Sequence, residues 1–295
     1  MAIPSFVLVS AVAGPPLVHH WQLLDGEHWQ IVGPAGEDVA LTDATEKTRG
    51  PCTPGMVAIK GRMKVDGWGY VDGVDVLQKT TCVDWLQRGF PARCEQFDRA
   101  QWLVRSKTLA TEDMDFCIDR FEYPNRRGAY PWIMVTWMEA AALCKRAGER
   151  LCTEAEWTFA CEGEEAMPYP YGYKRDAEVC VTDLPWRTVD ERSLSPRDSN
   201  RALAEIDRLW QGEPSGTRSR CRSPFGVYDM VGNVDEWTTS VVTGERPSIL
   251  KGGYWGRVRD RCRPSTRAHG EDFAFYQQGF RCCADSGSTA SSLRH

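Results

Sequence analysis

The stretch at residues 225–237 has the residue types and spacing that best suit a metal ion. It reads FGVYDMVGNVDEW, and its apolar positions follow neither a helical nor a strand period. Asp229 and Glu236 would supply carboxylates, and the backbone around Gly232 and Val234 would turn carbonyl oxygens inward. Such a set of oxygens suits Ca²⁺. The spacing is not that of an EF-hand, and a glycine-centred turn with its carboxylates in water is the alternative.

The composition of the chain argues against some classes of binding partner. The chain has 295 residues and a net charge of −5, with acidic and basic residues mixed throughout. This mixture argues against a nucleic-acid-binding surface. No apolar run approaches the roughly 20 residues of a membrane span. Twelve Trp with 26 Gly and 17 Pro predict much irregular backbone held by large aromatic side chains.

The twelve cysteines predict a disulfide framework. None forms a CxxC pair, and the five histidines do not flank them at zinc-finger spacing. An even number of dispersed cysteines is typical of an oxidising compartment, so we expect an extracytoplasmic protein, periplasmic or secreted. A cytosolic protein with buried free thiols is the alternative. A local bond between Cys82 and Cys94 is expected in a loop at residues 81–101, although separate partners for the two would also fit.

The elements that must position these residues are short. Residues 1–50 form an N-terminal segment, with an apolar run at 3–13 that resembles an atypical signal peptide and a hairpin around 21–32. One domain is expected over 51–285, followed by a disordered tail at 286–295. The alternation of apolar residues and the turn signals predict strands at residues 55–61, 116–123, 249–255 and 279–285.

Two helix starts are specified by their own sequence. Thr136 with Glu139, and Thr153 with Glu156, have the spacing of a capping box, in which side-chain oxygens accept from the free amides of the first turn. The first helix should end before Gly148 and the second before Gly163. A third, amphipathic helix is expected at residues 202–210.

Four segments together resemble the formylglycine-generating enzyme, or sulfatase-modifying factor, family. They read ERLCTEAEWTFACEG, FGVYDMVGNVDEW, LKGGYW and GFRCCAD, and the resemblance spans residues 55–285. It implies an α+β domain with a C-type-lectin-like core, little regular secondary structure and bound calcium. The calcium ligands that it implies are Asp229, the carbonyls of Gly232 and Val234, and Glu236. A second calcium site of the family is expected to be absent, because Arg208 stands where the family has an Asn and a guanidinium cannot ligate a cation.

The resemblance also implies two disulfides. Cys144 would pair with Cys282, and Cys161 with Cys262, each closing a loop of more than 100 residues. The other eight cysteines are additional to the family pattern, and Cys152 stands where the family has a Pro.

The chain departs from the family where its enzymes carry out their chemistry. Those enzymes oxidise a substrate cysteine with O₂ and copper held by two thiolates shortly after the Gly-Gly motif. Here only YWGRVRDR separates Gly253 from Cys262, and it contains no cysteine. Soft thiolates are what hold Cu(I), so copper and formylglycine formation are not expected. Iron is not expected either, because the three N-terminal histidines lack the helical His spacing of iron-dependent members.

Basic residues crowd the same segment instead. Five arginines at positions 257, 259, 261, 263 and 267 precede His269, Glu271 and Asp272. A cleft for a carboxylate or phosphate group would use Arg257, Arg259, Arg267, His269 and Glu271, because guanidinium groups bind such anions in a bidentate manner. Alternatively, His269 and Glu271 would begin a metal site or act in acid–base chemistry. A third interpretation is a solvated loop whose arginines pair with Asp260 and Glu271.

Two classes of function therefore follow from the sequence. The first is a calcium-stabilised binding module for a peptide or small molecule, without formylglycine-generating activity. The second is a copper- or iron-dependent oxidoreductase of altered chemistry. The missing thiolate pair favours the first.

Overall fold

The computed structural model describes residues 17–24, 28–34, 51–69 and 71–287. The expected apolar signal at residues 3–13 lies outside the described residues, as does nearly all of the expected tail. Within the described part of the chain, no helix combines the length and hydropathy needed to cross a bilayer.

Four antiparallel strands form the first sheet, in the order β3-β6-β12-β7. They span Met56–Val65 (β3), Ala110–Asp119 (β6), Cys282–Asp285 (β12) and Arg150–Leu151 (β7). The long β3–β6 pair runs in register from Met56 opposite Asp119 to Val65 opposite Ala110. The strand expected at 116–123 ends too late, because β6 stops at Asp119. The Asp119 carboxylate accepts from the Asn125 side chain and from the Cys282 amide, and the chain turns away from the sheet here.

The second sheet has the order β10-β9-β8-β11, and its strands β8 and β11 are parallel to each other. Its strands are Asp235–Thr239 (β8), Ser248–Lys251 (β9), Ser265–Thr266 (β10) and Gln278–Phe280 (β11). The strand expected at 249–255 is only partly correct, because Gly252 and Gly253 have φ of +89° and +78° and end β9.

The strand expected at 279–285 is in fact two strands. β11 pairs with the second sheet and β12 with the first, and Arg281 lies between them. The Arg281 side chain is fully buried and bonded to Glu236, so the chain crosses from one sheet to the other over a buried ion pair.

The two capping boxes form as the sequence predicts. Helix α3 covers Trp137–Arg146, with the Glu139 amide 3.1 Å from the Thr136 hydroxyl oxygen. Helix α4 covers Glu154–Glu162 and ends at Gly163, which has φ of +68°. The third helix, α5, covers Asn200–Leu209. The expected N-terminal hairpin is present as β1 (His19–Leu24) and β2 (His28–Pro34).

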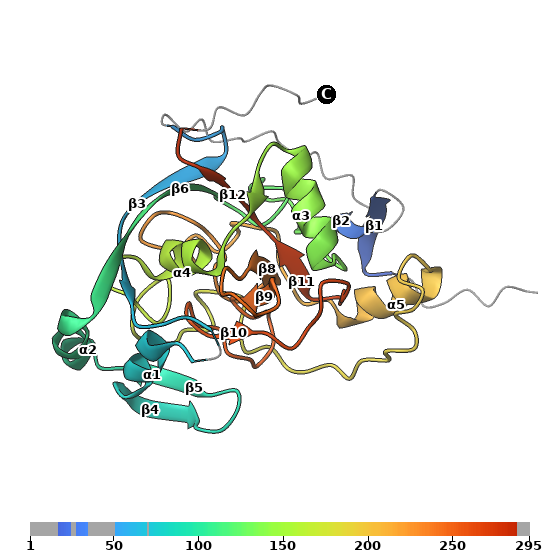
Figure 1. Cartoon of the computed structure of the whole chain (residues 1–295). Coiled ribbons are helices and arrows are strands. Elements are labelled where there is room, and N and C mark those ends of the chain that lie inside the picture. Colours follow the sequence, from blue (N-terminus) through green and yellow to red (C-terminus); the bar gives the residue numbers. More distant parts are fainter. Residues whose placement is uncertain (1–16, 25–27, 35–50, 70, 288–295) are drawn as a thin grey trace, which may run out of the picture.

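The segment expected as a loop at residues 81–101 is instead ordered. It contains the hairpin of β4 (Cys82–Gln87) and β5 (Arg93–Phe97), preceded by α1 (Gly73–Lys79) and followed by α2 (Arg99–Arg105) and the 3₁₀ turn η1 (Ser106–Thr108). Figure 1 shows these elements grouped at one end of the molecule, away from α3, α5 and the β1–β2 hairpin. The expected Cys82–Cys94 disulfide joins the two strands of the hairpin.

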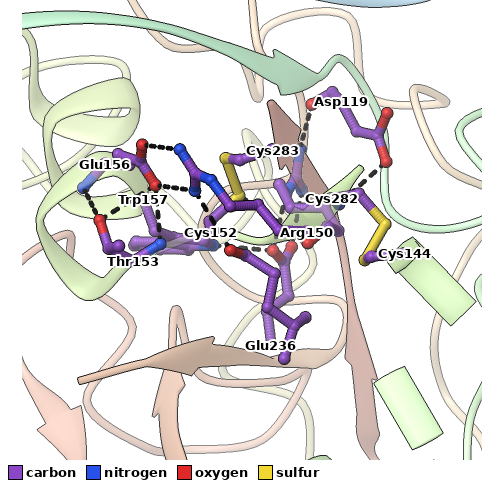
Figure 2. The surroundings of a disulfide bond; sticks show 12 residues. Asp119, Cys144, Arg150, Cys152, Thr153, Glu156, Trp157, Glu236, Cys282 and Cys283 are labelled. Atoms are coloured by element: carbon purple, nitrogen blue, oxygen red, sulfur yellow. Dashed lines mark hydrogen bonds and ion pairs between the residues drawn. A yellow bond between two sulfur atoms is a disulfide. The ribbon is translucent and has the colours of Figure 1, made fainter. Parts of the chain in front are cut away.

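All twelve cysteines are paired. The structure contains Cys144–Cys282 and Cys161–Cys262, the pairs that the resemblance implies. The remaining bonds are Cys52–Cys117, Cys152–Cys283 and Cys180–Cys221, with Cys82–Cys94. Two adjacent residues of β12, Cys282 and Cys283, thus bind the chain on either side of β7, as Figure 2 shows. Cross-links that close such long loops restrict the unfolded chain most strongly.

Candidate calcium loop and arginine-lined cavity

Between residues 229 and 233, the loop before β8 folds back through three left-handed residues. Asp229, Gly232 and Asn233 have φ of 56°, 78° and 55°. A Cβ on Gly232 would lie 2.3 Å from the Val181 carbonyl oxygen, so only glycine fits at that position. This backbone turns the Asp229 side chain into the interior, where it is 5% exposed. The alternative of a turn with its carboxylates in water is therefore wrong.

Buried carboxylates outnumber cations at this loop. Glu236 is bonded to Arg281 by two contacts of 2.6 Å. It also accepts from the Trp157 indole at 2.7 Å, as Figure 2 shows. Asp229 accepts from the Gly216 amide at 2.6 Å. Glu122 is fully buried and accepts from the Asn233 side-chain amide at 2.8 Å and from the Ser215 hydroxyl at 2.6 Å. It forms no ion pair with a described residue. Three carboxylates thus face one guanidinium.

Burial and the neighbouring negative charges raise the pKa of two carboxyl groups at this loop. Burial, followed by the charges of Asp229 and Glu236, raises the pKa of Glu122 well above its usual range. Burial also raises the pKa of Asp229 to about 7. A divalent cation would offset the charge, so the residues present fit calcium in their chemistry and net charge. Glu236 is the least available of the expected ligands, because Arg281 already binds both of its oxygens.

Other side-chain clusters in the described residues do not offer a metal site. The one trio of potential ligand side chains within 4.8 Å is Asp119, Glu149 and Cys282, whose sulfur is in a disulfide rather than a thiolate. At the position of the family's second calcium site, Arg208 donates to Glu205 at 2.8 Å and to the Thr188 carbonyl at 2.6 Å.

The arginines after the Gly-Gly motif are mostly buried and paired with acids from distant segments. Arg263 is 1% exposed and binds Glu162 at 2.6 and 2.8 Å, and Arg261 is 2% exposed and binds Asp75 at 2.8 Å. Arg259 binds Asp235, and Arg267 binds both Glu154 and Glu245.

The interpretation of these arginines as a solvated loop is therefore wrong. Asp260 binds Arg175 at 2.8 Å rather than a neighbour in its own segment, and Glu271 accepts from the Ser248 hydroxyl at 3.3 Å. The acids that bind the arginines come from α1, α4, β8 and the loop between β8 and β9, so only the tertiary fold brings them to the arginines.

A cavity of about 680 Å³ lies over this segment. Its lining includes six basic side chains and three acidic ones: Lys79, Arg88, Arg259, Arg261, Arg263 and Arg267, with Asp72, Asp75 and Glu154. The Nε atoms of Arg259 and Arg261 are buried and have no acceptor among the described residues. The hairpin tip, Arg88–Ala92, forms one wall of the cavity, and Phe90 at that tip is 97% exposed. A larger hollow, of about 1050 Å³ beside Lys174 and Arg222, contains none of the expected site residues.

The five residues expected to form one anion cleft do not all meet. Arg259 and Arg267 line the arginine-lined cavity, whereas His269 lines a different cavity and stacks on Phe273 at 4.0 Å. Arg257 is exposed, and Glu271 lines neither cavity. Residues that the sequence did not indicate complete the site: Glu122 at the calcium loop, and Lys79 and Arg88 at the cavity. The sequence around α1 and the β4–β5 hairpin contained no motif that would have placed Lys79 and Arg88 at this cavity.

Stability should depend on pH through Asp260, a buried neighbour of the cavity wall. Burial raises its pKa to about 7, above the 3.8 of an unperturbed carboxyl. Between these values the native state binds more protons at this site than the unfolded state, so this residue's contribution falls as pH rises from about 4 to 7. In Asp260→Asn, urea unfolding at pH 5 and pH 8 should show a smaller difference than in the wild type. The exposed Asp115→Asn control should leave the difference unchanged, and an unaltered difference in Asp260→Asn would rule out this assignment.

These features define a disulfide-rich α+β domain with an acidic loop before β8 and a basic cavity. The model of the family described as "Sulfatase-modifying factor enzyme 1-like domain" matches residues 66–286, so the chain belongs to this family and has its fold.

Relatives include enzymes and a protein named as inactive. The chain is 30% identical over 172 residues to the "Inactive C-alpha-formylglycine-generating enzyme 2" of Mus musculus, covering 55% of this chain and 52% of that protein. It is 30% identical over 186 residues to the "Formylglycine-generating enzyme" of Mycobacterium tuberculosis, covering 54% and 58%. The chain thus spans about half the length of the curated relatives it matches. Among solved structures it is similar to PvdO from Pseudomonas aeruginosa, with a TM-score of 0.48 and 18% identity over 81% of this chain and 98% of that one.

Proposed function

We propose that this protein is a calcium-stabilised, extracytoplasmic binding module that does not form formylglycine. Its ligand is a peptide or small molecule whose carboxylate or phosphate group enters the arginine-lined cavity. The observation that carries the proposal is the excess of basic groups there, with two buried guanidinium Nε atoms that lack an acceptor. A buried donor without an acceptor costs about 1–3 kcal/mol, which an anionic ligand would recover.

The absence of reactive sulfur supports a role in binding rather than oxidation. Every cysteine of the chain is in one of the six disulfides, and Cys262, the nearest to the Gly-Gly motif, is bound to Cys161. Thiolates are needed to hold Cu(I). His269 belongs to no trio of potential metal ligands in the described residues, so no observation favours the oxidoreductase alternative.

The hairpin tip favours a peptide over a small ion. Phe90 at the tip is 97% exposed and lines the cavity, and Val83 and Leu86 in the adjoining strand β4 are 61% and 51% exposed. Exposed apolar side chains beside a basic cavity suit a ligand that carries apolar groups next to its acid.

The Arg88→Gln substitution tests the cavity directly. Arg88 is exposed, lies over the Trp85 ring at 5.3 Å and forms no ion pair with a described residue, so its loss should leave the fold intact. Titration with a fluorescein-labelled peptide of alternating Glu and Leu should show affinity weakened about fivefold or more, the size of one lost charge-assisted contact. The matched control is Arg126→Gln, an exposed arginine outside the cavity. Equal affinity in Arg88→Gln and wild type, or equal weakening in both variants, would contradict the proposal.

A further inference from the structure

A second cavity, of about 670 Å³, lies where the start of α3 meets residues 269–278. It is lined by three aromatic rings that lie nearly parallel. His269 stacks on Phe273 at 4.0 Å with an interplanar angle of 6°, and Phe273 lies 5.8 Å from Phe275 at 22°. The proposed anion site does not use this cavity.

Backbone hydrogen bonds hold the aromatic wall in place. The His269 carbonyl accepts from the Ser248 hydroxyl at 2.8 Å, the Phe273 amide donates to Gly270 at 3.2 Å, and the Gln278 amide donates to Phe275 at 3.1 Å. The rings are therefore arranged before any ligand arrives, which lowers the entropic cost of binding.

Two amide oxygens at this cavity lack hydrogen-bond donors. Gln277 and Gln278 both line it, and the Oε1 atom of each is buried without a partner among the described residues. Gln278 is 2% exposed and lies in β11. Buried polar atoms are nearly always hydrogen-bonded, so two such oxygens at one cavity indicate a ligand that brings N–H donors.

The charge at this cavity is negative, opposite to that of the arginine-lined cavity. Glu191 and Asp272 line it, are exposed, and form no ion pair with another described residue. The basic side chain in the lining, Arg197, already binds Glu139 at 2.8 Å and the Met134 carbonyl at 3.0 Å. Burial lowers the pKa of His269, so its ring is neutral at pH 7 and adds no positive charge.

We propose that this second cavity binds a guanidinium group, from an arginine side chain in a peptide or from a free arginine-like molecule. A planar cation satisfies all the features together. Its N–H groups donate to the Gln277 and Gln278 oxygens, its face packs on the aromatic side chains, and its charge is met by Asp272 and Glu191. An ammonium group is less suitable, because it is a strongly hydrated point charge without a flat face.

Calorimetric titration of the intact, disulfide-bonded protein tests the assignment. The probes are arginine amide and two peptides, Gly-Gly-Arg-Gly-Gly and Gly-Gly-Lys-Gly-Gly, each with blocked ends. The arginine peptide should bind at least fivefold more tightly than the lysine peptide. If arginine amide binds as tightly as the arginine peptide, the free molecule is a sufficient ligand, whereas tighter peptide binding assigns the group to a peptide side chain. Equal binding of the two peptides, or binding of neither, would overturn the proposal.

Variants locate the binding and separate it from the anion site. Asp272→Asn and Gln277→Leu should each weaken binding of the arginine peptide about fivefold or more, while Asp198→Asn, an exposed acid outside the cavity, should not. Asp272 is exposed, so its variant should melt at the wild-type temperature. Arg88→Gln should bind the arginine peptide normally, so this proposal and the anion site can fail independently. Equal weakening in Asp272→Asn and Asp198→Asn would overturn the assignment.

Discussion

Replacing Arg281 with methionine should lower the free energy of unfolding by about 3–5 kcal/mol, because it leaves a buried charge uncompensated. The guanidinium is fully buried and forms two bonds of 2.6 Å with Glu236. It also donates to the carbonyls of Tyr228 at 2.9 Å and Asp119 at 3.2 Å, which would lose their donor. The charge of Arg281 also opposes the rise in the pKa of Glu122 and Asp229 in the same interior, so its loss makes their ionised forms less stable.

The same molecule offers a matched control for this experiment. Arg150 binds Glu156 by two bonds of 2.6 and 2.7 Å, drawn in Figure 2, but its side chain is 39% exposed. Exposed pairs contribute about 0–1 kcal/mol, so Arg150→Met should cost far less than Arg281→Met. The double substitution Glu236→Gln with Arg281→Met should recover part of the loss in a double-mutant cycle. Urea unfolding that shows equal losses in the two single variants would contradict the role of burial.

Calcium should raise the melting temperature by roughly 5–10 °C at about 100 times its dissociation constant, which corresponds to about 2.7 kcal/mol. The physical reason is the excess of buried carboxylates around Asp229, which a divalent cation would offset. Asp229→Ala should abolish this shift. It should cost little in the absence of calcium, because it also removes a carboxyl group whose charge is unfavourable in the interior.

Two controls make the calcium experiment specific. Magnesium at the same concentration should give a smaller shift, since it keeps its own water and requires octahedral geometry. Asp198→Ala, an exposed acid far along the chain from the loop, should retain the full calcium shift. Differential scanning calorimetry that shows the wild-type calcium shift in Asp229→Ala would refute the ligand assignment.

Features determined by a few neighbouring residues could be predicted from the sequence. The capping boxes at Thr136 and Thr153 depend on a hydroxyl and a carboxylate three residues apart, and both form. The hairpin near the N-terminus and the Cys82–Cys94 bond are similarly local. The fold class could be predicted because four motifs in the right order resemble those of one known family.

Features that depend on distant partners could not be predicted. The acids that bind Arg261 and Arg263, namely Asp75 and Glu162, lie about 100 or more residues away in sequence, so the sequence left a solvated loop open beside an anion cleft and a metal site. Glu122 gave no signal because its role arises only from proximity to the calcium loop. The sequence predicted one continuous strand at 279–285. Nothing in it indicates that Arg281 binds Glu236 at the point where the chain passes from the second sheet to the first.

The separation of His269 from Arg259 has the same origin. The two residues are ten apart, but the chain turns between them, and each lines a different cavity. Their grouping in one cleft assumed that closeness in sequence means closeness of side chains. The structure instead gives one basic and one acidic cavity, and these suit different chemical groups.

The most direct test of the account is whether the chain can oxidise a sulfatase-type peptide. The calcium-loaded, disulfide-bonded protein would be incubated with copper, O₂ and a Cys-X-Pro-X-Arg peptide, and the product analysed by mass spectrometry. We predict that the peptide cysteine remains unconverted, because no thiolate pair holds copper near the Gly-Gly motif. Formation of the aldehyde over repeated turnovers would contradict the assignment of this protein as a binding module.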